Sequence, residues 1–246
     1  MPKLEAYDRK QTYSYALGIF PATECLNACP AQCRRLLVHS QGEKSEGVNK
    51  LVERCEAAGV RVEVADRAIE RVAHKENCFA AMVFEKFERP FEPAAQHIVL
   101  HHPSDGGNLG TILRAALGFG FLNVAIIRPA VDVFDPRVIR SSMGAMFSLN
   151  VRHFDDFEAY RSEQSDRAFF PFMLTGAVPP AQAVTKAGEK YALIFGNEAS
   201  GLPEAFASYG TSVLIPHSSR IDSLNLSVAA GIGMYAFASA REEGKR

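Results

Sequence analysis

The sequence has almost no net charge, since 27 Lys and Arg residues stand against 28 Asp and Glu in a chain of 246 residues. A protein that works by coating nucleic acid is expected to be far more basic. Any binding of nucleic acid therefore needs a local basic patch, for which Arg34 and Arg35 are candidates.

The sequence also lacks a long apolar run. Its most apolar stretch, Leu224–Ala240, contains Asn225, Ser227 and Ser239 and falls short of the about 20 apolar residues that a membrane span needs. The polar residues 1–10 do not form the apolar core of a signal peptide. We therefore expect a soluble, cytoplasmic protein with no membrane segment.

Cysteine is scarce, and its odd count of five argues against a disulfide scaffold. Cys25, Cys29 and Cys33 follow one another at a spacing of four, which differs from the closer pairs typical of zinc sites. This spacing places Cys25 and Cys29 on one face of a helix that Pro30 ends. We interpret the cysteines as buried small hydrophobic residues and expect no metal.

Two prolines among charges at Glu88–Pro93 predict a linker between two α/β domains, 1–92 and 93–246, the first with a polar extension at 1–15. In the first domain we expect strands at 35–39, 61–65 and 80–84 and helices at 47–58 and 65–74. In the second we expect strands at 97–101, 123–128, 170–174, 191–195 and 212–215, and helices at 108–119, 135–143, 155–163, 202–208 and 227–240. Continuous apolar strands with helices between them predict a parallel sheet, which binds ligands at the carboxyl ends of its strands.

Three glycine-containing turns follow strands of the second domain: 102–114, 194–203 and 214–227. None matches a common phosphate-binding signature. Gly201 is followed by Leu and Pro instead of the Lys of a Walker loop, and Gly107 and Gly110 supply only a fragment of a dinucleotide fingerprint. An adenine-nucleotide or dinucleotide enzyme is therefore a weak alternative.

The helix after the first turn carries Gly110, Arg114 and Gly118 on one stripe. Because glycine in a helix costs about 1 kcal/mol against alanine, we expect a ligand or another chain to approach this stripe closely. Asn108 stands where the N-cap is expected. From these residues alone, Arg114 is also compatible with an ordinary solvated charge, and the Ser and Asn residues with ordinary helix caps.

Taken in order, the three turns resemble the signatures of the SpoU/TrmH family of RNA ribose 2′-O-methyltransferases. The matching residues are Asn108, Gly110 and Arg114 in the first turn, Gly196, Glu198, Gly201 and Leu202 in the second, and Ile215, Pro216, Ser223, Leu224, Asn225 and Ser227 in the third. The segment 140–144 is also similar to a family element. The chain departs from the family pattern at His217, Ser219, Asp222 and Asn150.

The resemblance implies an α/β fold of the SPOUT type, with a parallel sheet and a trefoil knot. It also implies a small preceding ribosomal-protein-like (L30e-like) domain that binds the substrate. The methyl donor would be S-adenosylmethionine, with no metal, and the active site would form in a homodimer. The expected reaction is methylation of a ribose 2′-hydroxyl in structured RNA, ribosomal RNA before transfer RNA. A non-catalytic RNA-binding protein of the ribosomal-protein type is the alternative.

The same resemblance assigns candidate site residues. The catalytic candidates are Arg114, Asn108, Glu198, Ser223 and Asn225, and the donor-binding candidates are Thr175, Gly176, Gly196, Asn197, Gly201, Ile215, Pro216 and Leu224. In the family the counterpart of Arg114 is proposed as the base, a role that is physically difficult because arginine stays protonated in proteins. Orientation of the target phosphate is the other role for Arg114, and the sequence leaves both open.

Overall fold

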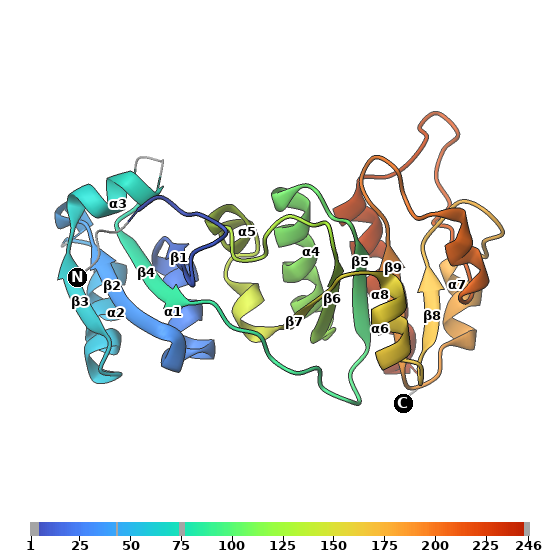
Figure 1. Cartoon of the computed structure of the whole chain (residues 1–246), viewed down its shortest axis with the longest axis horizontal. Helices are drawn as coiled ribbons and strands as arrows, with labels where there is room; N and C mark the ends of the chain where they lie inside the picture. Colours follow the sequence, from blue (N-terminus) through green and yellow to red (C-terminus); the bar gives the residue numbers. More distant parts are fainter. Residues whose placement is uncertain (1–4, 43, 74–76, 244–246) are drawn as a thin grey trace. The chain divides into compact units, whose positions relative to one another are not determined.

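The computed structural model describes residues 5–42, 44–73 and 77–243 and contains two compact units (Figure 1). The first unit comprises the chain up to Phe87 together with Asp132–Ser148. The second comprises Glu88–Val131 and the chain from Leu149 onward. The chain thus leaves the first unit where the linker is expected, but no feature of the sequence indicated that the later segment returns to it.

The first unit is built on a four-stranded mixed sheet in the order β1-β4-β2-β3. Only β2 and β3 pair in parallel. The strands are β1 (Tyr13–Leu17), β2 (Cys33–Val38), β3 (Arg61–Val64) and β4 (Ala80–Glu85), and the helices are α1 (Ile19–Ala28), α2 (Glu46–Ala57), α3 (Asp66–Ala73) and α5 (Pro136–Ser141).

The returning segment is tied to the first unit by aromatic packing and by a buried hydrogen bond. The ring of Phe84 lies 5.0 Å from that of Phe147 and 6.3 Å from that of Phe134, measured between centroids. The hydroxyl of Ser14 donates to the carbonyl oxygen of Phe134 over 2.5 Å. Because these side chains are apolar or buried, the core of the first unit depends on residues far away in sequence.

The second unit has a five-stranded sheet in the order β7-β6-β5-β9-β8, in which every pair is parallel. Its strands are β5 (His97–His101), β6 (Asn123–Ile127), β7 (Asn150–Phe154), β8 (Ala168–Pro171) and β9 (Tyr191–Phe195). Its helices are α4 (Gly106–Gly118), α6 (Phe157–Glu163), α7 (Pro180–Ala183) and α8 (Leu226–Glu243).

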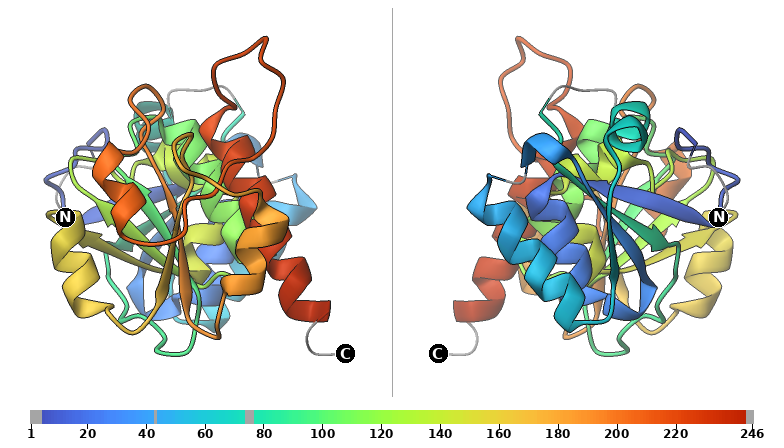
Figure 2. Two further views of the ribbon diagram at one scale, coloured as in Figure 1. Left: turned by 90° about the vertical axis from the view of Figure 1, so that its right-hand side faces the viewer. Right: turned by 90° about the vertical axis from the view of Figure 1, so that its left-hand side faces the viewer.

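Helices cover both faces of this sheet, with α4 and α8 packed together on one face and α6 on the other (Figure 2). Strands β5, β6 and β9 are buried along their whole length. The prediction of a parallel sheet covered on both faces is therefore confirmed.

Some expected elements differ from the structure. The segment 212–215 is not a strand: Val213 forms only isolated bridges, to Phe172 and Val178. The expected helix at 202–208 is a short 3₁₀ turn, Glu204–Ser208. The edge strands β1 and β7 were missed because each carries polar residues among its apolar ones. His74, the end of one predicted helix, lies outside the described residues.

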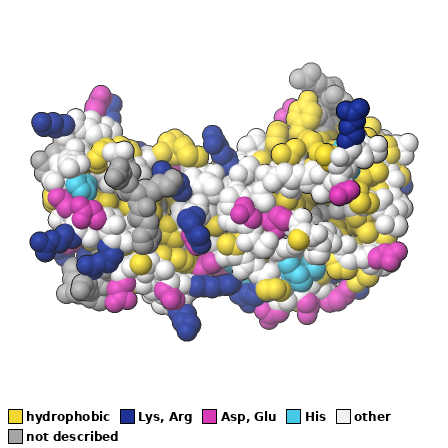
Figure 3. All heavy atoms as spheres, turned by 90° about the horizontal axis from the view of Figure 1, so that it is seen from above, with side chains coloured by type: hydrophobic (Ala, Val, Ile, Leu, Met, Phe, Trp, Pro, Cys, Tyr) yellow, Lys and Arg dark blue, Asp and Glu magenta, His cyan; other side chains and the backbone are white. Residues whose placement is uncertain are grey.

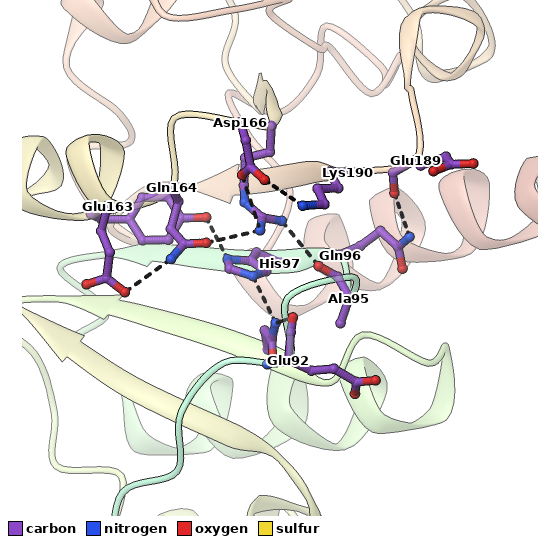
Figure 4. Close-up of polar contacts among 12 residues, drawn as sticks. Glu92, Ala95, Gln96, His97, Glu163, Gln164, Asp166, Glu189 and Lys190 are labelled. Atoms are coloured by element: carbon purple, nitrogen blue, oxygen red, sulfur yellow. Dashed lines mark hydrogen bonds and ion pairs between the residues drawn. The ribbon is translucent and has the colours of Figure 1, made fainter.

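A network of buried polar side chains lies at the amino ends of the strands in the second unit (Figure 4). The amide of Asn123 donates to Nε2 of His97 over 2.9 Å, and Nδ1 of His97 lies 2.9 Å from the hydroxyl of Tyr160. Since an amide nitrogen only donates, His97 carries its proton on Nδ1 and is neutral. Burial first, and then the charge of Arg167, lower the pKa of His97 to about 3.

Candidate functional site

The three predicted turns lie at the carboxyl edge of the second sheet. The first joins β5 to α4, the second follows β9, and the third leads into α8. Seen from this side, hydrophobic side chains and side chains of both charges share the surface (Figure 3). The turns are distant in sequence, so their mutual placement depends on the specific hydrogen bonds between them.

The carboxylate of Glu198 fastens the second turn to the first. Its Oε2 accepts hydrogen bonds from the backbone N–H of Ser104 (3.1 Å) and from the hydroxyl of Ser104 (2.8 Å). Its Oε1 accepts from the backbone N–H of Asp105 (3.1 Å) and from the side-chain amide of Asn108 (3.3 Å). These four donors from the first turn, all bound to one carboxylate, fix the start of α4.

These donors also set the protonation state of Glu198. Burial alone would raise the pKa of this carboxyl, but the hydrogen bonds from Ser104 and Asp105 outweigh it and hold the pKa below the usual range. Glu198 is therefore ionised at neutral pH. With its oxygens accepting from the first turn, it is suited to positioning and not to proton donation.

Asn108 connects Glu198 to the third turn. Its Oδ1 accepts a hydrogen bond of 3.1 Å from the amide of Asn225. The Oδ1 of Asn225 in turn accepts from the backbone N–H and the hydroxyl of Ser227, at 2.9 and 2.7 Å. Asn225 thus caps the start of α8 while it contacts the first turn, so Glu198, Asn108 and Asn225 form one continuous chain of hydrogen bonds.

The expectation that Asn108 caps its helix is wrong. The N-cap of α4 is Asp105, whose carboxylate accepts from the backbone N–H of Asn108 over 2.7 Å. The helix begins at Gly106, two residues earlier than expected. Because Asp105 caps the helix, the side chain of Asn108 is available to bridge Glu198 and Asn225.

The second turn is held by its own asparagine. The amide of Asn197 donates to the carbonyl oxygen of His102 over 2.8 Å, and its Oδ1 accepts from the backbone N–H of Ala199 over 2.9 Å. A Cβ on Gly196 would lie 2.2 Å from the carbonyl carbon of Gly201, so only glycine fits there. Gly201 has a φ of +66°, in the left-handed region that glycine adopts easily.

Two further catalytic candidates are exposed on the elements that carry Asn108 and Asn225. Arg114 lies on α4, and Ser223 precedes α8 by three residues. Neither side chain forms a hydrogen bond or an ion pair with any described residue. Arg114 is therefore a cation that the described part of the chain leaves unneutralised.

The remaining donor-binding candidates lie on the loops at the same edge. Thr175 and Gly176 form an exposed turn after β8, and Gly176 has a φ of +63°. Ile215, Pro216 and Leu224 flank the loop before α8; Ile215 and Leu224 are half-buried, and Pro216 is exposed. Leu174, which directly precedes Thr175, leaves 63% of its surface exposed.

Sequence reasoning missed Ser104 and Asp105, the partners of Glu198 and of the helix. Their signal was a Ser-Asp pair directly before a glycine-rich helix start, a pattern typical of caps. It also missed His102, which has a left-handed φ of +56° and whose ring stacks on that of His101 at 3.7 Å between centroids.

Among the described residues no group of three or more His, Cys, Asp or Glu is arranged to hold a metal ion. No described helix is long and apolar enough to cross a membrane.

Comparison with known proteins gives matches for this edge and for the fold around it. The SpoU rRNA Methylase family model matches residues 95–235. The chain is 28% identical over 151 residues to a 23S rRNA (guanosine(2553)-2′-O)-methyltransferase of Bacillus subtilis, a match that covers 60% of each protein. The chain spans 54–60% of the length of the first curated relatives that it matches.

Solved structures match over nearly the whole chain. A crystal structure described as an RNA 2′-O ribose methyltransferase has a TM-score of 0.79 at 25% identity and covers 96% of this chain and 93% of its own. The SpoU methyltransferase AviRb of Streptomyces viridochromogenes, in complex with AdoMet, has a TM-score of 0.80 at 21% identity, with coverages of 96% and 95%. At this identity the second match shows the fold alone.

Proposed function

The chain belongs to the SpoU rRNA methylase family, and from this premise we propose that it transfers a methyl group from S-adenosylmethionine to a ribose 2′-hydroxyl of RNA. The observation that carries the proposal is the hydrogen-bonded chain Glu198–Asn108–Asn225. It joins the three turns that resemble the family signatures, and Arg114, on the same helix as Asn108, is unneutralised by any described residue. The alternative of a non-catalytic RNA-binding protein does not explain this arrangement.

The loops at the carboxyl edge suit the donor. S-adenosylmethionine has no phosphate, and it supplies an electrophilic methyl group on sulfur. Backbone groups at Gly176, at Gly196–Gly201 and at Ile215 would hold its polar parts, and the exposed Leu174 offers an apolar contact for its adenine. We propose no metal for this site.

Arg114 would orient the acceptor. The reaction needs the ribose oxygen in line with the methyl group at near-attack distance, together with a route for the hydroxyl proton. A guanidinium stays charged and binds a phosphate through two parallel N–H donors. Arg114 would therefore hold the phosphate next to the target ribose. The hydroxyl proton would leave to that phosphate. Asn108, Asn225 and Ser223 would position Arg114 and the hydroxyl.

We also propose a role for the first unit and a path for the carboxyl-terminal segment of the second. The first unit would be the ribosomal-protein-like RNA-binding domain. Of its two candidate arginines, Arg34 is exposed and paired with Glu85, whereas Arg35 is largely buried and paired with Glu63. In the second unit the carboxyl-terminal segment would be threaded as a trefoil knot, supported by Val213 lying between Phe172 and Val178. An experimental trace of residues 169–216 tests the threading.

Ribosomal RNA is the proposed substrate, supported by the names of the relatives. The test compares 2′-O-methylation maps of total RNA from a deletion strain and its parent. We expect one ribosomal site to lose its methyl group and to regain it when the gene is restored. A transfer RNA site lost instead would correct the substrate, and unchanged RNA together with no binding of S-adenosylhomocysteine by the purified protein would contradict the function.

A further inference from the structure

Three thiols converge in the first unit, where α1 ends and β2 begins. The Sγ atom of Cys25 lies 3.8 Å from that of Cys29 and 3.7 Å from that of Cys33. Cys25 and Cys29 are buried, as the sequence analysis expected, whereas Cys33 is half-buried and reaches the surface. A buried thiol thus contacts a partner that small reagents in the solvent can reach.

Exposure distinguishes the two thiols next to Cys25. Cys29 directly follows α1, where its backbone N–H donates to the carbonyl oxygen of Cys25 over 2.9 Å. Only 3% of its surface is exposed. A peroxide in solution therefore reaches the half-buried Cys33 before it reaches Cys29.

Cys33 follows a short 3₁₀ turn, Pro30–Gln32, and its backbone N–H donates to the carbonyl oxygen of Pro30. It begins β2 at an irregularity, because the pairing with β4 shifts register between Cys33 and Arg35. An irregular strand end of this kind bends more readily than a regular ladder. The two sulfur atoms need to approach by roughly 1.6 Å to reach a bond of about 2.05 Å.

We propose that Cys25 and Cys33 form a reversible intramolecular disulfide when the protein meets a hydroperoxide. The sulfur of Cys33 attacks the peroxide oxygen and becomes a sulfenic acid, and the thiol proton leaves with the departing oxygen as water or an alcohol. The sulfur of Cys25 then attacks the sulfenyl sulfur. The hydroxyl leaves with the thiol proton as a second water, so each hydroperoxide consumed oxidises one pair of thiols.

The order of these steps follows from the surroundings of the two thiols. Hydrogen bonding with Cys29 and Cys33, followed by burial, raises the pKa of Cys25 and keeps it protonated. A protonated buried thiol reacts poorly with a peroxide in solution. Cys33 therefore meets the oxidant first, and Cys25 acts only when a sulfenic acid lies beside it.

The experiment uses the reduced full-length protein treated with hydrogen peroxide. Remaining thiols are blocked with one alkylating reagent, and thiols released by dithiothreitol are then labelled with a second. Cys25, Cys29 and Cys33 share one tryptic peptide, Gln11–Arg34, so fragment ions assign each label. We expect the second label on Cys25 and Cys33 together, a loss of two hydrogens from the unreduced peptide, and the first label on Cys29.

Variants separate this pair from its neighbours. Cys33→Ser should abolish the disulfide, whereas Cys29→Ser, a change at the third thiol of the cluster, should leave its yield within twofold of the parent protein. Circular dichroism confirms that each variant is folded. A bond between Cys25 and Cys29, a bond from Cys33 to Cys55 of α2, or oxidation of Cys33 to a sulfinic acid without a disulfide would each overturn the proposal.

Discussion

Arg114 is the residue whose role depends most on its surroundings. It is exposed on α4 and has no partner among the described residues, so its charge is available for an anion. We expect Arg114→Ala to lower methyl transfer by at least ~10²-fold, within the range that electrostatic groups supply. Arg114→Lys should rescue poorly, because lysine lacks the planar pair of donors.

Single-turnover transfer to a cognate RNA, with the affinity for S-adenosylhomocysteine measured in parallel, checks this prediction. Donor affinity should change little, since other loops are proposed to hold the donor. Lys50→Ala, which removes an exposed cation on α2, is the matched control. Transfer by Arg114→Ala equal to that of the control would remove Arg114 from the mechanism.

Glu198 should behave as a positioning residue. Glu198→Gln keeps the size of the side chain, but its Nε2 cannot accept a hydrogen bond, so the donors of Ser104 or Asp105 lose their acceptor. Hydrogen bonds to charged groups contribute about 1.5–3 kcal/mol, and we expect unfolding of this variant at a lower denaturant concentration, together with roughly tenfold slower transfer. The control is Glu204→Gln, an exposed change on the next 3₁₀ turn; equal behaviour of the two variants would contradict this positioning role.

At the scale of elements, His97 makes the sheet of the second unit sensitive to acid. Its pKa is lowered to about 3 in the folded protein, against about 6.5 in an unfolded chain. The unfolded state therefore binds the proton first, so this contribution to stability is complete above pH 6.5 and is lost as the pH falls. The expected loss is about 2 kcal/mol between pH 7 and pH 5.

Denaturant unfolding at several pH values, for the parent protein and for His97→Phe, measures this contribution. The variant should be less stable at pH 7, because Asn123 and Tyr160 lose a partner. Its stability should also fall less steeply as the pH is lowered. Parallel curves for the two proteins would show that His97 does not titrate between the folded and unfolded states.

Gly210 lies so close to the backbone of Phe169 that we expect no larger residue to fit there. A Cβ on Gly210 would lie 2.1 Å from the carbonyl oxygen of Phe169, and backbone cannot move aside as a flexible side chain does. We expect Gly210→Ala to destabilise the protein by at least about 3 kcal/mol, measured as a lower denaturation midpoint. Gly188→Ala, where nothing lies within 4 Å, should be close to neutral. A neutral Gly210→Ala would mean that this contact is looser than described.

For the whole molecule, the outer face of α8 favours a dimer. Val228, Ile232 and Tyr235 follow one another at spacings of four and three, so they share one helix face, and they leave 49, 39 and 61% of their surfaces exposed. We expect light scattering to give a dimer for the parent protein and a monomer for Ile232→Asp, because burial of an unpaired carboxylate is costly. Val64→Asp, at an exposed valine of β3, should stay dimeric. A monomeric parent protein with full activity would contradict the prediction.

The two units also restrict how the chain can be divided. A cut after residue 92 would remove Ser14 and Phe84, against which Phe134 packs. The segment Asp132–Ser148 would then expose its apolar side chains. Point substitutions at Arg34 and Arg35 therefore test RNA binding by the first unit better than truncation does.

The sequence by itself determined the parallel sheet of the second unit and the place of the candidate site. Buried strands such as β9 are continuous apolar runs, and the motifs that follow the buried strands had to meet at the carboxyl edge. The sequence pattern did not predict β7, because only part of this strand is buried and Arg152 and His153 interrupt its apolar residues.

Only the tertiary structure decided which groups touch. The bonds from Ser104 and Asp105 to Glu198 join residues more than 90 positions apart. Asp105, whose backbone N–H donates to Glu198, also caps α4 in place of the expected Asn108. The return of Asp132–Ser148 to the first unit was likewise invisible in the sequence. The physical reason is that propensity and periodicity act within a few residues, whereas clamps and shared cores form between groups that the fold alone brings together.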